Sequence, residues 1–115
     1  MGYKIGVTPE QRLDQLRKFA EQKPGDPFAR YALAMGLRSA GRQEDAVREF
    51  EELVRRAPEY VPSYLMLGQV LEALSRREEA ARVYEAGVTA ATRAHDEHAR
   101  GELSQALEAL RREGN

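Results

Sequence analysis

The sequence contains no cysteine and no tryptophan, and it has only two histidines. The lack of cysteine excludes disulfide bonds, thiolate nucleophiles and thiolate-bound metals, and it favours a reducing compartment. The sequence also lacks an apolar run near the ~20 residues of a membrane-spanning helix, and its first residues do not have the form of a secretory signal. We therefore expect a cytoplasmic protein that has no membrane partner.

An excess of charge of either sign is absent as well. The chain of 115 residues has 18 Lys and Arg against 19 Asp and Glu, which gives a formal net charge of -1. Nucleic-acid binding needs a local surplus of basic side chains to neutralise phosphates. The composition therefore argues against a nucleic-acid partner, and the length is that of one small domain.

Motifs of catalysis are also missing: the sequence has no glycine-rich phosphate loop and no nucleophile elbow. The nearest approach to a metal site is the pair His95 and His98, with Glu102 one helical turn later. A solvated helix start capped by Asp96 explains this segment more simply. We expect no catalytic residues, no metal site and no cofactor, and therefore no enzymatic activity.

What the sequence does contain is an internal repeat. Residues 33–57 match residues 67–91 when the chain is shifted along itself by about 34 residues, a period that is typical of stacked repeat architectures. The half-unit 9–24 repeats the second part of the same unit, and residues 103–110 repeat 67–74 at a shift of 36. The matched pairs include Leu33 and Leu67, Leu37 and Leu71, Ala46 and Ala80, and Phe50 and Tyr84.

Apolar residues recur within each unit at steps of three and four, which predicts helices rather than strands. Caps mark three of the helix starts. Thr8 and Gln11 have the spacing of a capping box, Asp26 precedes Pro27, and Asp96 precedes the last apolar series. The predicted helices span residues 9–22, 27–40, 43–57, 61–74, 77–93 and 97–112.

Glycines indicate where the helices end. We expect Gly25 and Gly41 to adopt the left-handed conformation that terminates a helix. In the second unit Ser75 stands at the position of Gly41, and Thr92 stands where the first unit has proline, so the helix before it can continue. Gly87 falls inside a predicted helix, where glycine costs ~0.5–1 kcal/mol relative to alanine. It indicates either a close neighbour or a frayed helix.

These positions resemble the tetratricopeptide repeat, a pair of antiparallel helices in about 34 residues. Arg30 replaces the aromatic residue that Tyr64 supplies in the second unit. The resemblance implies an all-α fold in which about six helices form antiparallel hairpins, stacked as a short right-handed α-solenoid. The first unit meets the family pattern at Leu33, Ala34, Leu37, Gly41, Ala46, Phe50 and Pro58, and the second at Tyr64, Leu67, Gly68, Leu71, Ala80, Tyr84 and Thr92.

The resemblance also implies a division of the chain. Residues 9–112 would form one domain, residues 1–8 an N-terminal extension and residues 113–115 a C-terminal tail. Within the domain we expect a half repeat 9–24, full repeats 27–60 and 61–94, and a capping helix 97–112. The outer face of that last helix is polar, as the end of a solenoid requires, and carries Arg100, Glu102, Gln105, Glu108, Arg111 and Arg112.

Proteins of this family generally act as scaffolds or adaptors, and the first helix of each pair lines a concave face that holds a peptide or an amphipathic helix of another protein. The side chains at the front of this face would form an apolar stripe suited to such a ligand. The resemblance places the following partner-binding residues on the concave face: Phe28, Tyr31, Met35, Arg38, Leu65, Gln69, Glu72 and Gln105, with His98, Gly101 and Glu108 beside them.

Alternatives stay open for this apolar stripe. It could pack within the hairpins, or residues 3–7 could cover it. A second copy of the chain could also use it in a homodimer, as could the apolar side of the first helix. A further cluster, Tyr60, Val61 and Tyr64, lies at the start of a predicted helix, where exposure would invite a partner or a second copy.

Overall fold

The computed structural model describes residues 6–114, and in that range it contains helices and no strands. The all-α prediction is therefore confirmed, and each predicted helix end lies within one residue of the observed one. The helices are α1 (Pro9–Gln22), α2 (Pro27–Ser39), α3 (Gln43–Arg56), α4 (Pro62–Ala73), α5 (Arg77–Arg93) and α6 (Glu97–Glu113).

The three predicted caps are present. At α1 the N–H of Gln11 donates to Thr8 Oγ1 at 3.1 Å, and the N–H of Thr8 donates to Gln11 Oε1 at 2.9 Å. Asp26 accepts a hydrogen bond from the N–H of Phe28, and Asp96 accepts one from the N–H of Ala99, both at 3.0 Å. These bonds satisfy N–H groups that have no partner inside their own helix.

The helix ends agree with the prediction in part. Gly41 has the expected positive φ of 78°, but Gly25 does not adopt a positive φ, because α1 already ends at Gln22 ahead of Pro24. Ser75 (φ 61°) and His95 (φ 57°) take the left-handed conformation instead. Each of these three residues lies in the same kind of turn after a helix, which we call the left-handed link. In each link the next backbone N–H donates to a carbonyl of the preceding helix, from Arg42 to Leu37, Arg76 to Leu71 and Asp96 to Ala91, at 2.8–2.9 Å.

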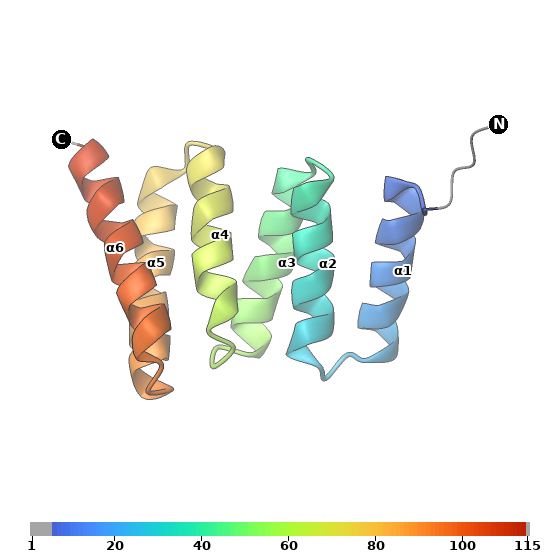
Figure 1. Ribbon diagram of the computed structural model, residues 1–115, viewed down its shortest axis with the longest axis horizontal. Coiled ribbons are helices and arrows are strands. Elements are labelled where there is room, and N and C mark those ends of the chain that lie inside the picture. Colours follow the sequence, from blue (N-terminus) through green and yellow to red (C-terminus); the bar gives the residue numbers. More distant parts are fainter. Residues whose placement is uncertain (1–5, 115) are drawn as a thin grey trace.

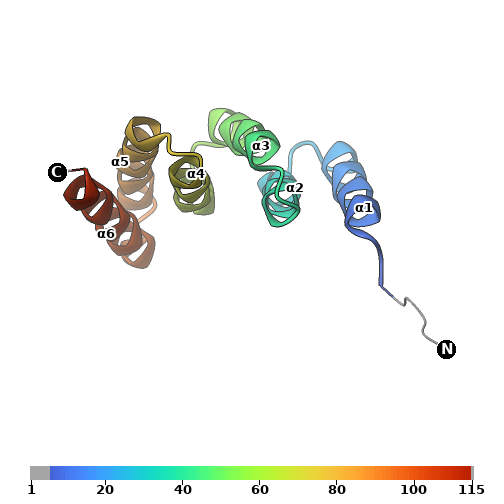
Figure 2. The same ribbon diagram turned by 90° about the horizontal axis from the view of Figure 1, so that it is seen from above.

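The six helices stand side by side and run alternately up and down along the 53 Å axis of the molecule (Figure 1). Seen from above, α2, α4 and α6 lie along one side, and α3 and α5 lie along the other (Figure 2). Each helix packs against its neighbours in the chain, and α4 also packs against α6. The fold therefore presents two distinct helical faces.

No helix within residues 6–114 has the length and apolar character needed to cross a membrane.

Small residues set the spacing between the helices, as the repeat pattern predicts. A Cβ at Gly68 would overlap the ring of Tyr84, and a Cβ at Gly87 would lie 2.6 Å from Cβ of Tyr64 and 2.9 Å from a methyl group of Leu103. Gly87 therefore accommodates close neighbours, and α5 is not frayed there. Tyr84 itself is fully buried. Helix α5 continues to Arg93, in keeping with the absence of proline near its end.

Candidate protein-binding face

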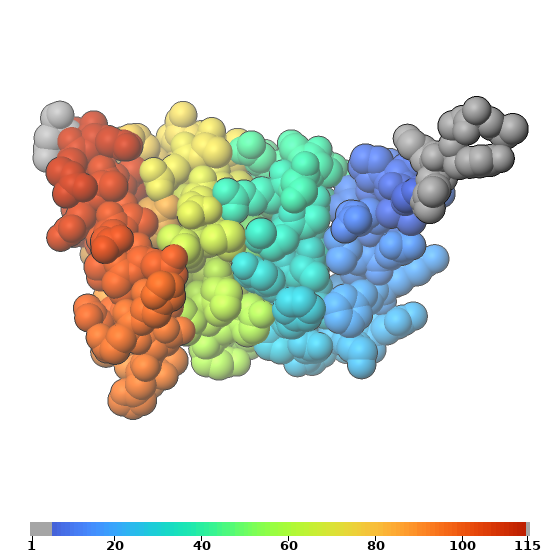
Figure 3. Space-filling view, viewed as in Figure 1, coloured from blue at the N-terminus to red at the C-terminus, as the bar shows by residue number. Residues whose placement is uncertain are grey.

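Helices α2, α4 and α6 form the surface that faces the viewer in Figure 3, called the inner face below. The eight residues predicted to bind a partner all belong to these three helices. Phe28, in the first turn of α2, is 53% exposed, and Gln105 on α6 is also exposed. The other six side chains are half-buried, so each combines a packing role with an exposed surface: Tyr31, Met35, Arg38, Leu65, Gln69 and Glu72.

A cavity of about 340 Å³ opens on the inner face between α4 and α6, with Tyr31 of α2 at its edge. We call it the inner cavity. It brings together Tyr31 and Leu65 of the eight predicted residues, and the other six lie outside its lining. Its wall consists of Tyr31, Val61, Pro62, Leu65, Met66, Asp96, His98, Ala99, Glu102 and Leu103.

Tyr31 is held in place by a row of aromatic rings. Its ring centroid lies 6.1 Å from that of Phe50 in the core and 5.7 Å from that of Tyr60, both in edge-to-face geometry. Phe28 lies 6.5 Å from Tyr31 and 6.4 Å from Phe19 of α1, which extends the row across the N-terminal end of the face. Burial raises the pKa of Tyr31, so its hydroxyl remains a hydrogen-bond donor at neutral pH.

Two polar residues of the inner face, Arg38 and Glu72, form hydrogen bonds with side chains of other helices. Arg38 Nη1 donates a hydrogen bond to Met66 Sδ at 3.3 Å, which ties α2 to α4. Glu72 accepts a hydrogen bond from the hydroxyl of Tyr84. Burial and this carboxylate raise the pKa of Tyr84, which keeps the hydroxyl protonated as a donor. Replacing Arg38 or Glu72 would therefore disturb packing as well as the surface.

The charges on the inner face are unevenly distributed. At the α6 side of the inner cavity lie the carboxylates of Asp96 and Glu102, and His98 Nε2 lies 3.4 Å from Glu102 Oε1. Arg38 lies on the α2 side. A ligand crossing from α2 to α6 therefore passes from apolar and basic surroundings to acidic ones.

Sequence reasoning missed part of the inner cavity and misplaced other residues. Glu102 was expected on the outer face of the last helix, but it lines the cavity beside α4. The condition of exposure is not met by two of the three residues clustered at the start of α4, because Val61 is 7% exposed and Tyr64 is 4% exposed. Met66 lies three residues before Gln69, and helical spacing alone could have placed it on this side. The expectation that residues 3–7 cover the face falls mostly outside the described residues.

The histidine pair does not form part of a metal site in the structure. Residues 6–114 contain no group of three or more His, Asp or Glu side chains placed to hold a metal ion. His95 occupies the left-handed link before α6, and the side chain of His98 is 88% exposed and lies next to Glu102.

The chain is a helical-repeat protein. This class is defined by paired helices that recur along the chain, here with small residues where the helices cross and the same left-handed link after three of them. The chain belongs to the tetratricopeptide repeat family, which matches it over residues 7–84. The fold of this family is a scaffold for protein interactions rather than for catalysis, and in this general sense the chain is a protein-interaction module.

Solved structures support the assignment. The crystal structure of a tetratricopeptide repeat domain protein from Salinibacter ruber is 35% identical, covers 75% of this chain and 97% of its own, and has a TM-score of 0.72. The solution structure of a tetratricopeptide repeat domain protein from the same organism is 36% identical over 76% of this chain and 88% of its own, with a TM-score of 0.73. A Bordetella parapertussis protein, 23% identical over 88% of both chains, shares the fold with a TM-score of 0.75. No curated protein matches the sequence.

Proposed function

We propose that this protein is an adaptor that binds a peptide or an amphipathic helix of another protein on its inner face. The observation that carries the proposal is the inner cavity, where Tyr31, Leu65 and Val61 provide an apolar wall that is open to solvent. Aromatic side chains held by neighbouring rings offer a large contact area with little loss of conformational entropy on binding. The remaining predicted residues would then surround this anchor point.

The proposal includes the other expectations of the sequence. The protein would act without enzymatic activity, without a nucleic-acid or membrane partner, and in the cytoplasm, which the lack of cysteine favours. Residues 9–112 would act as one domain, with 27–60 and 61–94 as its full repeats.

The test uses peptides selected from a random displayed library against the whole chain, followed by calorimetric titration of the selected peptide. Leu65→Glu should weaken binding at least about tenfold, because it places a charge against an apolar ligand side chain. Ala86→Glu introduces the same side chain at an exposed position of α5 on the opposite side of the molecule, and it should leave the affinity unchanged. Equal effects of the two variants would contradict the proposal.

A second candidate is self-association through the same face. It is favoured by Phe28, whose ring is 53% exposed at the end of the aromatic row. Light scattering across a concentration series distinguishes the two candidates, because the monomer has a mass of 13.0 kDa. A dimer that Leu65→Glu dissociates would support self-association. A monomer at all concentrations would leave the inner face open for a partner.

A further inference from the structure

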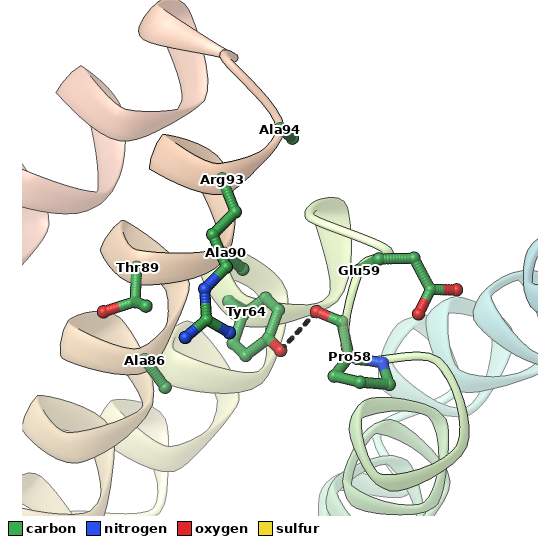
Figure 4. A pocket seen from close by; sticks show the side chains of 8 residues that line it. All are labelled: Pro58, Glu59, Tyr64, Ala86, Thr89, Ala90, Arg93 and Ala94. Atoms are coloured by element: carbon green, nitrogen blue, oxygen red, sulfur yellow. Dashed lines mark hydrogen bonds between the residues drawn. The ribbon is translucent and has the colours of Figure 1, made fainter.

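A second open surface lies on the opposite side of the molecule. A cavity of about 540 Å³ separates the C-terminal half of α5 from the loop between α3 and α4, and its wall includes Pro58, Tyr64, Ala86, Ala90 and Arg93 (Figure 4). A cavity of about 320 Å³ continues toward the start of the same helices and shares Tyr64 and Ala86 with the first. Together they form one channel between α3 and α5, which we call the outer groove.

The outer groove exists because α3 and α5 each pack extensively on α4, whereas no extensive packing joins α3 to α5 in the described chain. Its floor is fixed, since Tyr64 is almost fully buried and its hydroxyl donates to the carbonyl of Pro58 at 2.6 Å (Figure 4). Its wall on α5 is low, because Ala86 and Ala90 face it one helical turn apart. An apolar channel of helical length is therefore present without rearrangement.

The preceding repeat shows that the fold alone does not open this groove. There the positions of Ala86 and Ala90 hold Glu52 and Arg56, which form an ion pair at 2.5 Å. The position of Tyr64 holds Arg30, which pairs with Glu49 at 2.7 Å. The corresponding cavity, beside Pro24 and Arg30, measures only about 110 Å³. The second repeat has thus replaced charged, space-filling side chains with an aromatic floor and two alanines.

The rims of the outer groove carry opposite charges. Glu79, near the start of α5, also lines the groove but is already paired with Arg76 at 2.6 Å. Of the other charged side chains, Glu51 and Glu59 lie on the α3 side, and Arg82 and Arg93 lie on the α5 side. Within residues 6–114 none of these four side chains forms an ion pair, although most arginines of the described chain do. The charges beside the groove are therefore available to an incoming molecule.

We propose that the outer groove binds one amphipathic helix of a partner protein, with a stripe of apolar side chains, one basic flank and one acidic flank. The basic flank would lie against Glu51 and Glu59, and the acidic flank against Arg82 and Arg93. From Glu79 to Ala94 the groove follows α5 for about 24 Å, which is between four and five helical turns. This surface is separate from the inner face and does not depend on the function proposed there.

The charged rims also set the direction of the bound helix. A helix turned end for end in a groove keeps its apolar stripe down but exchanges its flanks. A peptide with mixed flanks can therefore satisfy both rims in one direction only. A peptide whose flanks are both basic or both acidic always places one flank against like charge, which costs affinity.

The test uses three synthetic helical peptides of about 18 residues that share one stripe of leucine and alanine. The mixed peptide has lysines on one flank and glutamates on the other, the second peptide has lysines on both flanks, and the third has glutamates on both. Their binding to the whole chain is measured by fluorescence anisotropy and mapped by amide chemical shifts. The mixed peptide should bind about tenfold more tightly than the other two. Its shifts should fall on Ala86, Thr89 and Ala90.

Two double variants sharpen the test. Ala86→Glu with Ala90→Arg copies the Glu52 and Arg56 pair of the preceding repeat, so it should fold normally by circular dichroism and reduce binding at least about tenfold. Arg82→Glu with Arg93→Glu makes both rims acidic and should transfer the preference to the lysine-only peptide. Leu65→Glu on the inner face is the control for location, and it should leave the affinity of the mixed peptide for the outer groove unchanged.

Several outcomes would overturn the proposal. They are equal binding of the three peptides to the unmodified chain, no binding of any of them, unchanged affinity in the folded Ala86→Glu and Ala90→Arg variant, or shifts confined to the inner face. A dimer without peptide that this variant dissociates would assign the groove to a second copy instead. Because Leu65→Glu tests the inner face by itself, failure of one proposal leaves the other intact.

Discussion

At the scale of single residues, Ser63 in the first turn of α4 is an unusual member of the core. It is fully buried, and its hydroxyl has no hydrogen-bond partner within residues 6–114. The equivalent position in the preceding repeat holds Ala29, which is also fully buried. An unpaired buried hydroxyl costs free energy, and the first repeat shows that the site is built for a methyl group.

Ser63→Ala should therefore raise the free energy of unfolding by about 1 kcal/mol, measured by urea denaturation. The reciprocal change Ala29→Ser is the matched control and should lower it by ~1–3 kcal/mol. A destabilised Ser63→Ala protein would mean that the hydroxyl is satisfied in solution, for example by a buried water.

Two helical glycines should respond in opposite directions to the same substitution. At Gly87 a Cβ would lie 2.6 Å from Cβ of Tyr64, which can move only with its backbone, whereas at Gly101 no heavy atom lies within 4 Å. We expect Gly87→Ala to destabilise the protein by ~1–3 kcal/mol through overpacking. Gly101→Ala should stabilise it by ~0.5–1 kcal/mol through helix propensity. Thermal unfolding measures both effects: the melting temperature should fall for Gly87→Ala and rise for Gly101→Ala. Shifts in the same direction would contradict this interpretation.

At the scale of the helices, α3 carries a dense set of ion pairs on its exposed side. Arg55 and Arg56 donate hydrogen bonds to Glu52, and these bonds lower the pKa of its carboxyl to about 2. Arg42 and Arg48 lower the pKa of Asp45 in the same way. These pairs link successive turns of the helix and join its start to the residue before it.

The Glu52 shift predicts a pH dependence of stability. Its pKa is lower in the folded protein than in the unfolded chain, so its stabilising effect is complete above about pH 4.5 and is lost as the pH falls toward about 2. The unfolding free energy of Glu52→Gln should therefore change less with pH over this window than that of the unmodified protein. Glu51→Gln is the matched control, because Glu51 forms no ion pair within residues 6–114. If the unfolding free energy of Glu52→Gln changed with pH as steeply as that of the unmodified protein, the pH dependence would not come from Glu52.

Much at this scale could be predicted from the sequence, because the signals are local. Thr8, Asp26 and Asp96 cap helices through bonds to residues two or three positions away, so spacing alone identified them. Tyr31 and Leu65 were placed on the binding face because the repeat gives both the same position. The predicted left-handed conformation of Gly25 was wrong, because α1 already ends at Gln22 ahead of Pro24.

The remaining features depend on contacts between helices. Glu102 joins the inner cavity because α6 turns that side chain toward α4, and the position of Glu102 within its own helix does not reveal this. The outer groove was not anticipated either. Its opening follows from side chains on three helices acting together, namely Tyr64 on α4, Ala86 on α5 and the acidic residues at α3.

At the scale of the whole molecule, the packing is nearly linear. Helix α1 packs mainly against α2, whereas α4 packs against α3, α5 and α6. In such arrays stability is close to a sum of neighbour terms, so the end with fewer neighbours opens first.

Hydrogen exchange should show this gradient. We expect the slowest amides of α1 to exchange with an opening free energy at least ~1 kcal/mol below that of the slowest amides of α4 and α5. Exchange resolved by mass spectrometry on peptic fragments measures the difference. Helix α6 serves as the internal comparison, because it also lies at an end but packs on two helices. Uniform protection across all six helices would indicate a single cooperative unit instead.

The sequential packing has a kinetic consequence as well. Because the extensively packed helix pairs of the described chain are consecutive and α4 makes only a small contact with α6, most native contacts join residues close together along the chain. Little loop-closure entropy must be lost before such contacts form, and helical proteins of this kind reach the native state within microseconds to milliseconds. The same arrangement that exposes two faces for binding should thus let a newly synthesised chain acquire its structure hairpin by hairpin, before the following segment is complete.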